Sequence, residues 1–183
     1  YIYNGIDPET YSSLNKREEK RNFFLSLGDT KPIKGHKLAI ELAKEIGEDM
    51  GLDLVIAGEP CYDVSREYFE REISPRIDID FSSNNDKRKF LREIEKGNGL
   101  GKGRVIYFGS ANDKEKSILL RYARFTQFLG NLEVPGNIEA CPNVPLESIL
   151  SGTPVLGVKG SVTEELVDEG ITGFNICLLY TSD

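Results

Sequence analysis

This sequence lacks the residue patterns that mark metal-binding and disulfide-rich proteins. It contains one histidine and no C-x-x-C pair, and its three cysteines, Cys61, Cys141 and Cys177, are widely separated. A structural zinc site needs clustered ligands, and a disulfide framework needs an even number of cysteines. We therefore expect no metal, and the scattered thiols favour a reducing compartment such as the cytoplasm.

Long apolar runs and excess basic charge are absent as well. No stretch approaches the roughly 20 apolar residues that span a bilayer, so no transmembrane segment is expected. The net charge of −7 and the pI of about 4.9 argue against a nucleic-acid partner, which would need a basic face. The 183 residues, 39% hydrophobic, are typical of one globular domain. No signal peptide is visible, and a chain that begins at Tyr1 rather than Met is expected to be a piece of a longer protein.

Strands and helices alternate in the first part of the chain. An apolar strand at 22–27 ends at Gly28, and an amphipathic helix runs from the following loop to Met50. A second apolar strand at 52–57 ends at Gly58. This order predicts a right-handed β-α-β unit with parallel strands.

The second half repeats the alternation. The expected elements are a strand at 105–109, a helix from an Asn112–Glu115 capping pair to Ala123, a strand at 125–129, a helix ending at Ser151, a strand at 154–158, a helix opened by a Ser161–Glu164 capping box, and a strand from Phe174. We interpret 1–21 as a junction segment. We interpret 59–103 as an irregular excursion with short helices at 66–73 and 86–96, ending in a flexible glycine-rich connector at 97–103. The pattern predicts an α/β fold, a doubly wound parallel sheet sandwiched by helices, with ligands at the carboxyl ends of the strands.

Two carboxylates stand eight residues apart after the strand at 125–129. The run is Glu139-Ala-Cys-Pro-Asn-Val-Pro-Leu-Glu147, and Gly152-Thr-Pro-Val155 follows the short helix. Carboxylates accept hydrogen bonds from sugar hydroxyls, and N–H groups at a helix amino end face phosphate oxygens. The stretch therefore suits a polyhydroxylated, phosphorylated ligand. The alternative is that Glu147, near the third helical position, only complements the helix dipole, and that Glu139 is an ordinary loop residue.

The loop at 28–35 lies where a phosphate-binding P-loop would lie, between a strand and a helix. It lacks the P-loop pattern, because Ile33 precedes Lys34 and Gly35 follows it where that pattern needs Gly and Ser or Thr. A lysine at a helix amino end opposes the dipole. Lys34 therefore either neutralises an anionic ligand or extends its side chain into water. His36 is expected to be an exposed residue of the first helical turn, without a role as a base.

Six segments, in order, resemble the family-four retaining glycosyltransferases. They are Asn4-Gly-Ile-Asp7, the Gly28–Gly35 loop, the Ile-Ala-Gly strand end at 56–58, the strand at 105–109 with Asp113–Lys116, the E-x7-E and Gly-Thr-Pro-Val run from Glu139 to Val155, and Gly160–Phe174. The resemblance implies the C-terminal, nucleotide-sugar-binding domain of a two-domain enzyme of the GT-B fold, with an acceptor domain ahead of Tyr1. Residues 175–183 match nothing in that family and are expected to be a non-native tail.

The resemblance also implies roles for individual residues. Lys34 would bind the donor diphosphate, Glu139 the hydroxyls of the transferred sugar, and Glu147 the ribose, so Glu139 and Lys34 would be the catalytic residues. The other donor-binding residues would be Gly28, Gly109, Ala140, Cys141, Asn143 and Val144. A cation and helix N–H groups can stabilise the charge that develops on a nucleoside diphosphate leaving group, so neither a cofactor nor a metal is required.

The intact enzyme implied by this resemblance would be a cytoplasmic or peripheral membrane protein of polysaccharide biosynthesis. It would transfer a hexose from a nucleotide diphosphate sugar to a glycan or lipid-linked acceptor, with retention. Some residues depart from the family pattern: Asp29 replaces an arginine, and Pro142 and Pro145 each remove an N–H donor. Two alternatives therefore stay open, a catalytically degenerate domain that serves as a ligand-binding or assembly module, and another sugar-nucleotide enzyme of the same fold, such as an epimerase or a phosphorylase.

Overall fold

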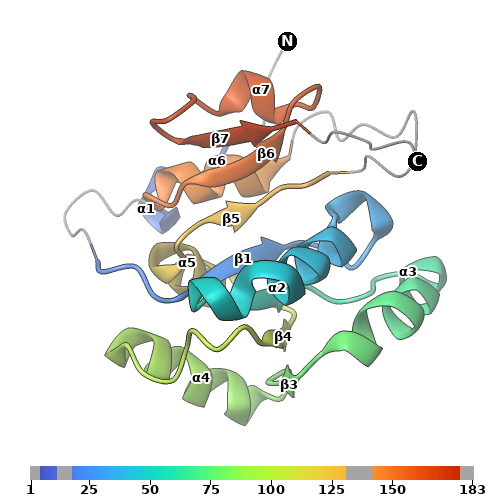
Figure 1. Ribbon diagram of the computed structural model, residues 1–183. Coiled ribbons are helices and arrows are strands. Elements are labelled where there is room, and N and C mark those ends of the chain that lie inside the picture. Colours follow the sequence, from blue (N-terminus) through green and yellow to red (C-terminus); the bar gives the residue numbers. More distant parts are fainter. Residues whose placement is uncertain (1–4, 12–17, 131–141, 178–183) are drawn as a thin grey trace.

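Seven parallel strands form one sheet in the computed structural model, which describes residues 5–11, 18–130 and 142–177 (Figure 1). In spatial order they are β3 (Ile79–Asp80), β4 (Val105–Gly109), β2 (Asp53–Ala57), β1 (Phe23–Leu27), β5 (Thr126–Gln127), β6 (Val155–Val158) and β7 (Gly173–Ile176). Every pairing is parallel, which confirms the predicted doubly wound sheet. The order reverses between β1 and β5, so the topological switch point lies there.

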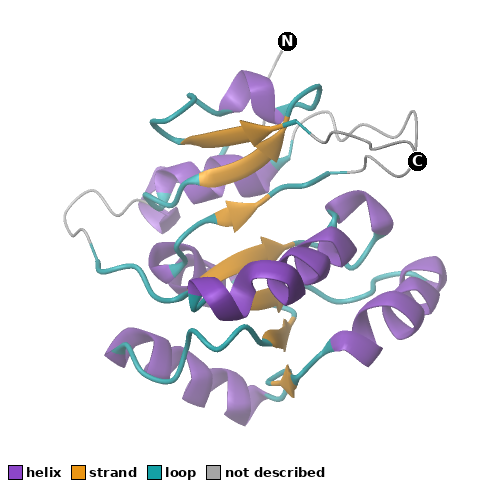
Figure 2. Ribbon diagram, viewed as in Figure 1, coloured by secondary structure: helices purple, strands orange, loops and turns teal. Residues whose placement is uncertain are grey.

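Helices cover both faces of this sheet (Figures 1 and 2). One face carries α2 (His36–Met50), which follows the 3-10 turn η1 (Pro32–Lys34), and then α3 (Asp63–Tyr68), the π-helical η2 (Phe69–Ile73) and η3 (Ser74–Arg76). The other face carries α1 (Pro8–Tyr11), α4 (Asn84–Lys96) and α5 (Asp113–Tyr122). The helices α6 (Asn143–Leu150) and α7 (Thr163–Leu166) pack against β6.

The alternation of side chains along β1 divides the core between the two faces. Phe23, Leu25 and Leu27 belong to the cluster under α4 and α5, whereas Phe24 belongs to the cluster under α2. Because successive residues of a strand point to opposite faces, Ser26 lies on the same face as Phe24. A polar residue therefore stands in the middle of the sheet, under the amino end of α2.

Residues 59–103, predicted as an irregular excursion, are instead part of the domain. They supply α3, the edge strand β3 and α4, and Phe90, Leu91 and Ile94 of α4 pack in the same cluster as Ile106 and Phe108 of β4. The two short helices expected in this region are present, as α3 with η2 and as α4. The interpretation of the region as an excursion was wrong because β3 has two residues, one of them an aspartate, which is too short a run to show a strand pattern. Its pairing with β4 is decided by tertiary packing.

A buried carboxylate anchors the glycine-rich segment 97–103. Asp53 is fully buried at the start of β2 and accepts hydrogen bonds from the N–H groups of Gly101, Lys102 and Arg104 at 3.1, 2.9 and 2.8 Å. The Arg104 guanidinium also donates to Asp53, at 2.7 Å. The four glycines of the segment have positive φ, which lets the chain coil around the carboxylate. The expected flexible connector is thus a loop held in place by hydrogen bonds.

The two predicted capping boxes have different outcomes. Asn112 and Glu115 form the predicted reciprocal pair at the start of α5, with distances of 3.1 and 3.0 Å. The Ser161–Glu164 box was wrong. Ser161 Oγ instead donates to the Val158 carbonyl at 2.7 Å and accepts from the Thr163 N–H, because α7 begins one residue later than expected.

The chain ends lie partly outside the described residues. The junction segment contains α1, and the strand β7 includes 175 and 176 of the predicted tail, whereas 178–183 are not described. Among the residues that the structure describes, no helix has the length and apolar character needed to cross a membrane. Within the same residues, no group of three or more His, Cys, Asp or Glu side chains is arranged to hold a metal ion.

Candidate functional site

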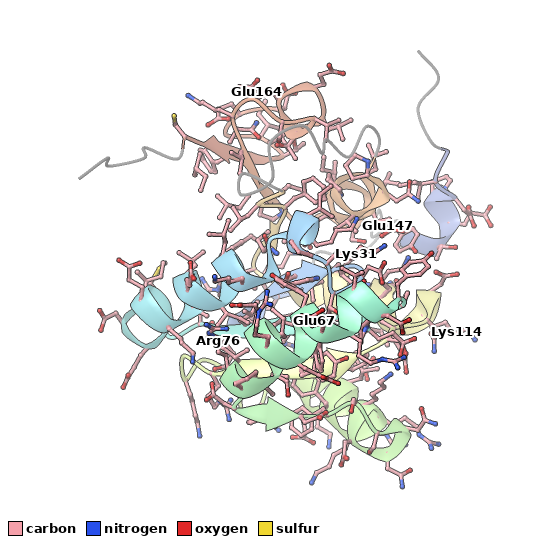
Figure 3. The ribbon with its side chains drawn as sticks, turned by 90° about the vertical axis from the view of Figure 1, so that its right-hand side faces the viewer. Lys31, Glu67, Arg76, Lys114, Glu147 and Glu164 are labelled. Carbon is pink, nitrogen blue, oxygen red and sulfur yellow. The ribbon has the colours of Figure 1, made fainter. Side chains whose placement is uncertain are left out.

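A pocket of about 320 Å³ opens at the carboxyl edge of the sheet, beside the switch point. It is lined by Leu27, Gly28, Asp29, Ala57, Gly58, Glu59, Cys61, Ser110, Ala111, Lys116, Asn143, Val144 and Glu147. These residues come from the ends of β1, β2 and β4, from α5 and from the start of α6. Figure 3 faces this edge, with Glu147 of α6 and Lys31 of the loop after β1 near the centre of the view. Doubly wound folds bind their ligands at this place.

Glycines form the floor of the pocket. Gly28 and Gly58 directly follow β1 and β2, and Gly109 ends β4. The Gly28 N–H donates to the Ala57 carbonyl at 3.0 Å, and the Gly58 N–H donates to the Gly109 carbonyl at 2.8 Å. A β-carbon on Gly58 would lie 1.8 Å from the Gly28 carbonyl oxygen. At Gly28 and Gly58 the floor is therefore made of backbone packed directly on backbone.

Gly58→Ala is expected to destabilise the chain by about 1 to 3 kcal/mol, the usual cost of forcing extra volume into a packed site. The added methyl group would push the Gly28 loop away from β2. Urea unfolding measures the loss. Gly130→Ala is the matched control, because its β-carbon would make an ordinary contact at 3.7 Å. Equal stability of the two variants would show that the Gly28 loop is not packed against Gly58 as described.

Glu147 is buried at the wall of the pocket and is held by an ion pair. Its side chain is 7% exposed, and its Oε1 lies 2.8 Å from Lys116 Nζ of α5. Burial lowers the pKa of Lys116, but hydrogen bonds to Glu147 and Tyr11 outweigh that effect and raise the pKa above its usual value. Lys116 therefore stays charged. Glu147 is the fifth residue of α6, too far along to cap the helix, so the capping alternative is wrong.

Lys34 lies in η1, half-buried, beside the pocket rather than in its lining. A β-carbon on Gly28 would meet Lys34 Cδ and Cε at 3.4 Å, so the aliphatic part of the side chain lies along the glycine. Lys34 therefore lies beside Gly28, which lines the pocket.

Asp29 is neutralised by its own loop. Its carboxylate forms an ion pair with Lys31, whose Nζ lies 4.7 Å from the centre of the Tyr62 ring. Although burial opposes it, hydrogen bonds from Cys61 and Lys31 hold the pKa of Asp29 below its usual value. The extra negative charge that the sequence places near a diphosphate is thus balanced within the loop.

His36 was predicted to be exposed, and that prediction was wrong. It is fully buried at the amino end of α2, with Nδ1 2.6 Å from Ser26 Oγ and Nε2 3.2 and 3.0 Å from the carbonyl oxygens of Gly28 and Asp29. Carbonyls only accept, so Nε2 carries the proton and Nδ1 accepts from Ser26. Burial lowers the pKa of His36 to about 4. The signal in the sequence was Ser26, a polar residue in an otherwise apolar strand, which needs a buried partner.

Lys87 of α4 is a second residue that the sequence did not single out. It is buried, its Nζ donates to the Ser110 carbonyl, and it lies 5.2 Å from the centre of the Phe108 ring. Ser110 lines the pocket, so the hydrogen bond from Lys87 helps to hold the pocket wall in place.

The structure brings four of the candidate donor-binding residues, Gly28, Asn143, Val144 and Glu147, together around the pocket. Gly109 does not line the pocket itself but directly precedes Ser110, which does. Glu139, Ala140 and Cys141 lie outside the described residues. The binding roles assigned to all of these residues stay predictions.

A doubly wound parallel sheet with helices on both faces, and with a pocket beside its switch point, defines a Rossmann-like α/β domain. The family model for glycosyl transferases group 1 matches residues 8–176, and the chain belongs to this family. The resemblance found in the sequence motifs is thereby confirmed. A search of the curated proteins gives no match.

Solved structures share the fold at low sequence identity. HepE from Anabaena, solved in complex with UDP and glucose, gives a TM-score of 0.63 at 19% identity, covering 96% of this chain and 42% of that chain. AviGT4, a glycosyltransferase involved in avilamycin A biosynthesis, gives a TM-score of 0.59 at 23% identity, covering 95% of this chain and 44% of that chain. The C-terminal domain of LpcC, a glycosyl transferase group 1 family protein from Francisella tularensis, gives a TM-score of 0.57 at 16% identity, covering 94% of this chain and 80% of that chain. The chain thus spans less than half the length of the first two.

Proposed function

We propose that this chain is the donor-binding domain of a retaining glycosyltransferase. The observation that carries the proposal is the buried, ion-paired Glu147 beside a backbone-floored pocket at the switch point. The domain binds a nucleotide diphosphate sugar there. With an acceptor domain ahead of Tyr1, the whole enzyme transfers a hexose to a glycan or lipid-linked acceptor with retention. It acts in polysaccharide biosynthesis, in the cytoplasm or at the membrane surface.

The charged groups around the pocket suit the parts of such a donor. Lys116 holds Glu147 through Oε1, so the other carboxylate oxygen can accept a hydrogen bond from a ribose hydroxyl. Lys34, lying along Gly28, reaches the diphosphate, and the first-turn N–H groups of α6 point the same way. Glu139 binds the hydroxyls of the transferred sugar. These groups compensate the charge of the leaving diphosphate, so the reaction needs neither a metal nor a cofactor.

A catalytically degenerate domain is the second candidate. Asp29 in place of the family's arginine favours it, because the cation of that position is lost and Lys31 is engaged in neutralising Asp29. Pro145 favours it too, since it removes one N–H group from the first turn of α6.

Titration of the chain with UDP, GDP and ADP, by calorimetry or NMR, tests the proposal. UDP comes first because HepE was solved with it. One nucleotide should bind, and Lys34→Ala should weaken that binding about 10- to 100-fold, as expected for the loss of a charge-assisted hydrogen bond. Glu147→Ala should weaken it as well, by removing the ribose acceptor and leaving Lys116 without its partner.

Lys114→Ala is the matched control, because it removes the same charge from an exposed position on α5 that does not line the pocket (Figure 3). It should bind nucleotide like the parent chain. Absence of binding at millimolar nucleotide, or an equal loss in all three variants, would contradict the donor-site assignment. In the whole enzyme, release of nucleoside diphosphate only when an acceptor is present would separate transfer from isomerisation.

A further inference from the structure

We propose that His36 is a positioning residue: in its neutral, Nε2-protonated form it holds the loop after β1 so that a backbone N–H group points into the pocket. The inference rests on the proposed donor site and specifies how its phosphate-facing loop is kept in place. It concerns a residue that does not line the pocket. His36 acts through the Gly28–Asp29 backbone.

A directed chain of hydrogen bonds fixes the state of His36. The Leu129 N–H donates to Gln127 Oε1 at 2.8 Å, which leaves Gln127 Nε2 to donate to Ser26 Oγ. Ser26 Oγ then donates to His36 Nδ1 at 2.6 Å. Backbone N–H groups only donate and carbonyls only accept, so both ends of the chain fix its direction. The chain links β5, β1 and α2, on both sides of the switch point.

Hydrogen bonds from the imidazole fix the orientation of two peptide groups of the loop. Nε2–H points at the carbonyl oxygens of Gly28 and Asp29, at 3.2 and 3.0 Å. In a trans peptide the N–H is opposite to the C=O. The N–H of Asp29 is therefore directed away from His36, and both Gly28 and Asp29 line the pocket. The Asp29 N–H has no backbone acceptor among the described residues, whereas the Thr30 N–H donates to the Glu59 carbonyl at 3.4 Å.

Only the neutral imidazole can make this set of contacts. A protonated ring donates from both nitrogens, so Ser26 Oγ would accept from both His36 and Gln127, and the buried Ser26 hydroxyl would lose the acceptor of its own hydrogen. The charged groups that face His36 are Asp29 and Lys34 of the adjoining loop and η1, with Lys31 and the Cys61 thiol behind Asp29. β1 and β5 present the uncharged Ser26 and Gln127.

The state of His36 can be measured directly, because it is the single histidine of the chain. Nitrogen-15 NMR of the imidazole should show a neutral ring protonated at Nε2 across the neutral pH range, with and without UDP. A ring protonated at Nδ1, or an ordinary titration near pH 6.5 in the folded chain, would overturn the proposal. A residue buried only for packing would have no reason to keep one tautomer.

Two substitutions separate positioning from packing. His36→Gln keeps a donor near the place of Nε2, so UDP affinity should stay within about threefold of the parent. The Thr30 amide, which donates to the Glu59 carbonyl, should stay protected from exchange. His36→Phe fills the volume without the hydrogen bonds, so affinity should fall about tenfold and the Thr30 amide should exchange faster. Ile40→Val is the control, because it loosens α2 in the core without touching the loop. Equal effects of His36→Phe and Ile40→Val on affinity and on exchange of the Thr30 amide would contradict the proposal.

The outcomes distinguish this inference from the proposed function. If no nucleotide binds the parent chain, the donor-site assignment fails, while the tautomer of His36 and the exchange rates of the Thr30 amide still decide whether His36 holds the loop. If nucleotide binds but His36→Phe binds it as tightly as the parent does, the role of His36 fails and the donor site stands.

Discussion

Asp53→Ala is expected to lower the free energy of unfolding by about 3 to 5 kcal/mol, the usual result of removing one partner from a buried ion pair. The substitution leaves Arg104 without its carboxylate and leaves the N–H groups of Gly101, Lys102 and Arg104 without their acceptor. The segment 97–103 would lose its anchor. Since it lies between α4 and β4, two elements of the core, the loss should affect the whole domain.

Urea unfolding followed by circular dichroism measures this loss. Glu93→Gln is the matched control, because it breaks the exposed Glu93–Lys96 pair in the same part of the molecule and should leave stability nearly unchanged. A loss below about 1 kcal/mol for Asp53→Ala, the level of a surface ion pair, would contradict the anchoring role of the carboxylate.

Acidification is expected to destabilise the folded chain through His36. The pKa of His36 is about 4 in the folded chain, against an ordinary value of 6.5. Above pH 6.5 both states hold a neutral ring, and the stability contributed by the buried neutral form is fully present. As the pH falls below 6.5, His36 becomes protonated in the unfolded chain but stays neutral in the folded chain, so stability falls until about pH 4. The cost at about pH 4.5 should be about 2 to 3 kcal/mol from this group alone.

The contribution of His36 is obtained by comparing how much stability the parent chain and a His36 variant each lose on acidification. Carboxylates also titrate in this range, so unfolding free energies should be compared between the parent chain and His36→Gln at about pH 7 and about pH 4.5. The parent should lose about 2 to 3 kcal/mol more than the variant over this interval. Equal losses of stability in the parent and the variant would show that His36 has the same pKa in the folded and unfolded chains, contrary to its full burial.

The sheet could be predicted from the sequence because its central strands are apolar runs closed by glycine. β1, β2 and β4 have only buried residues, and Gly28, Gly58 and Gly109 mark their ends. β3 could not be predicted, since two residues carry no periodicity and its pairing depends on β4. β5 was predicted at 125–129 but only Thr126 and Gln127 pair, because the chain departs from the sheet where Leu129 bonds to the Gln127 side chain.

The candidate site was predictable in its location but not in its supporting contacts. Strand ends of a parallel sheet meet at one edge, so the Gly28 loop and Glu147 had to approach each other. The partner of Glu147 could not be foreseen, because the Lys116–Glu147 pair depends on how α5 and α6 lie side by side, 31 residues apart in sequence. His36 was missed for a related reason: helical spacing gives a residue's face but not the depth at which the helix end is buried.

The pocket joins segments that are far apart in the order of synthesis. Leu27, Gly28 and Asp29 leave the ribosome more than a hundred residues before Asn143, Val144 and Glu147, and β1 gains its neighbour β5 only after β2 and β4 are complete. A nascent chain that ends before β5 therefore carries a sheet with β1 as an open edge, and a chain that ends before α6 still has no complete binding site. Any ligand of this pocket binds only the finished domain and, by linking its two halves, protects the completed protein rather than guiding its assembly.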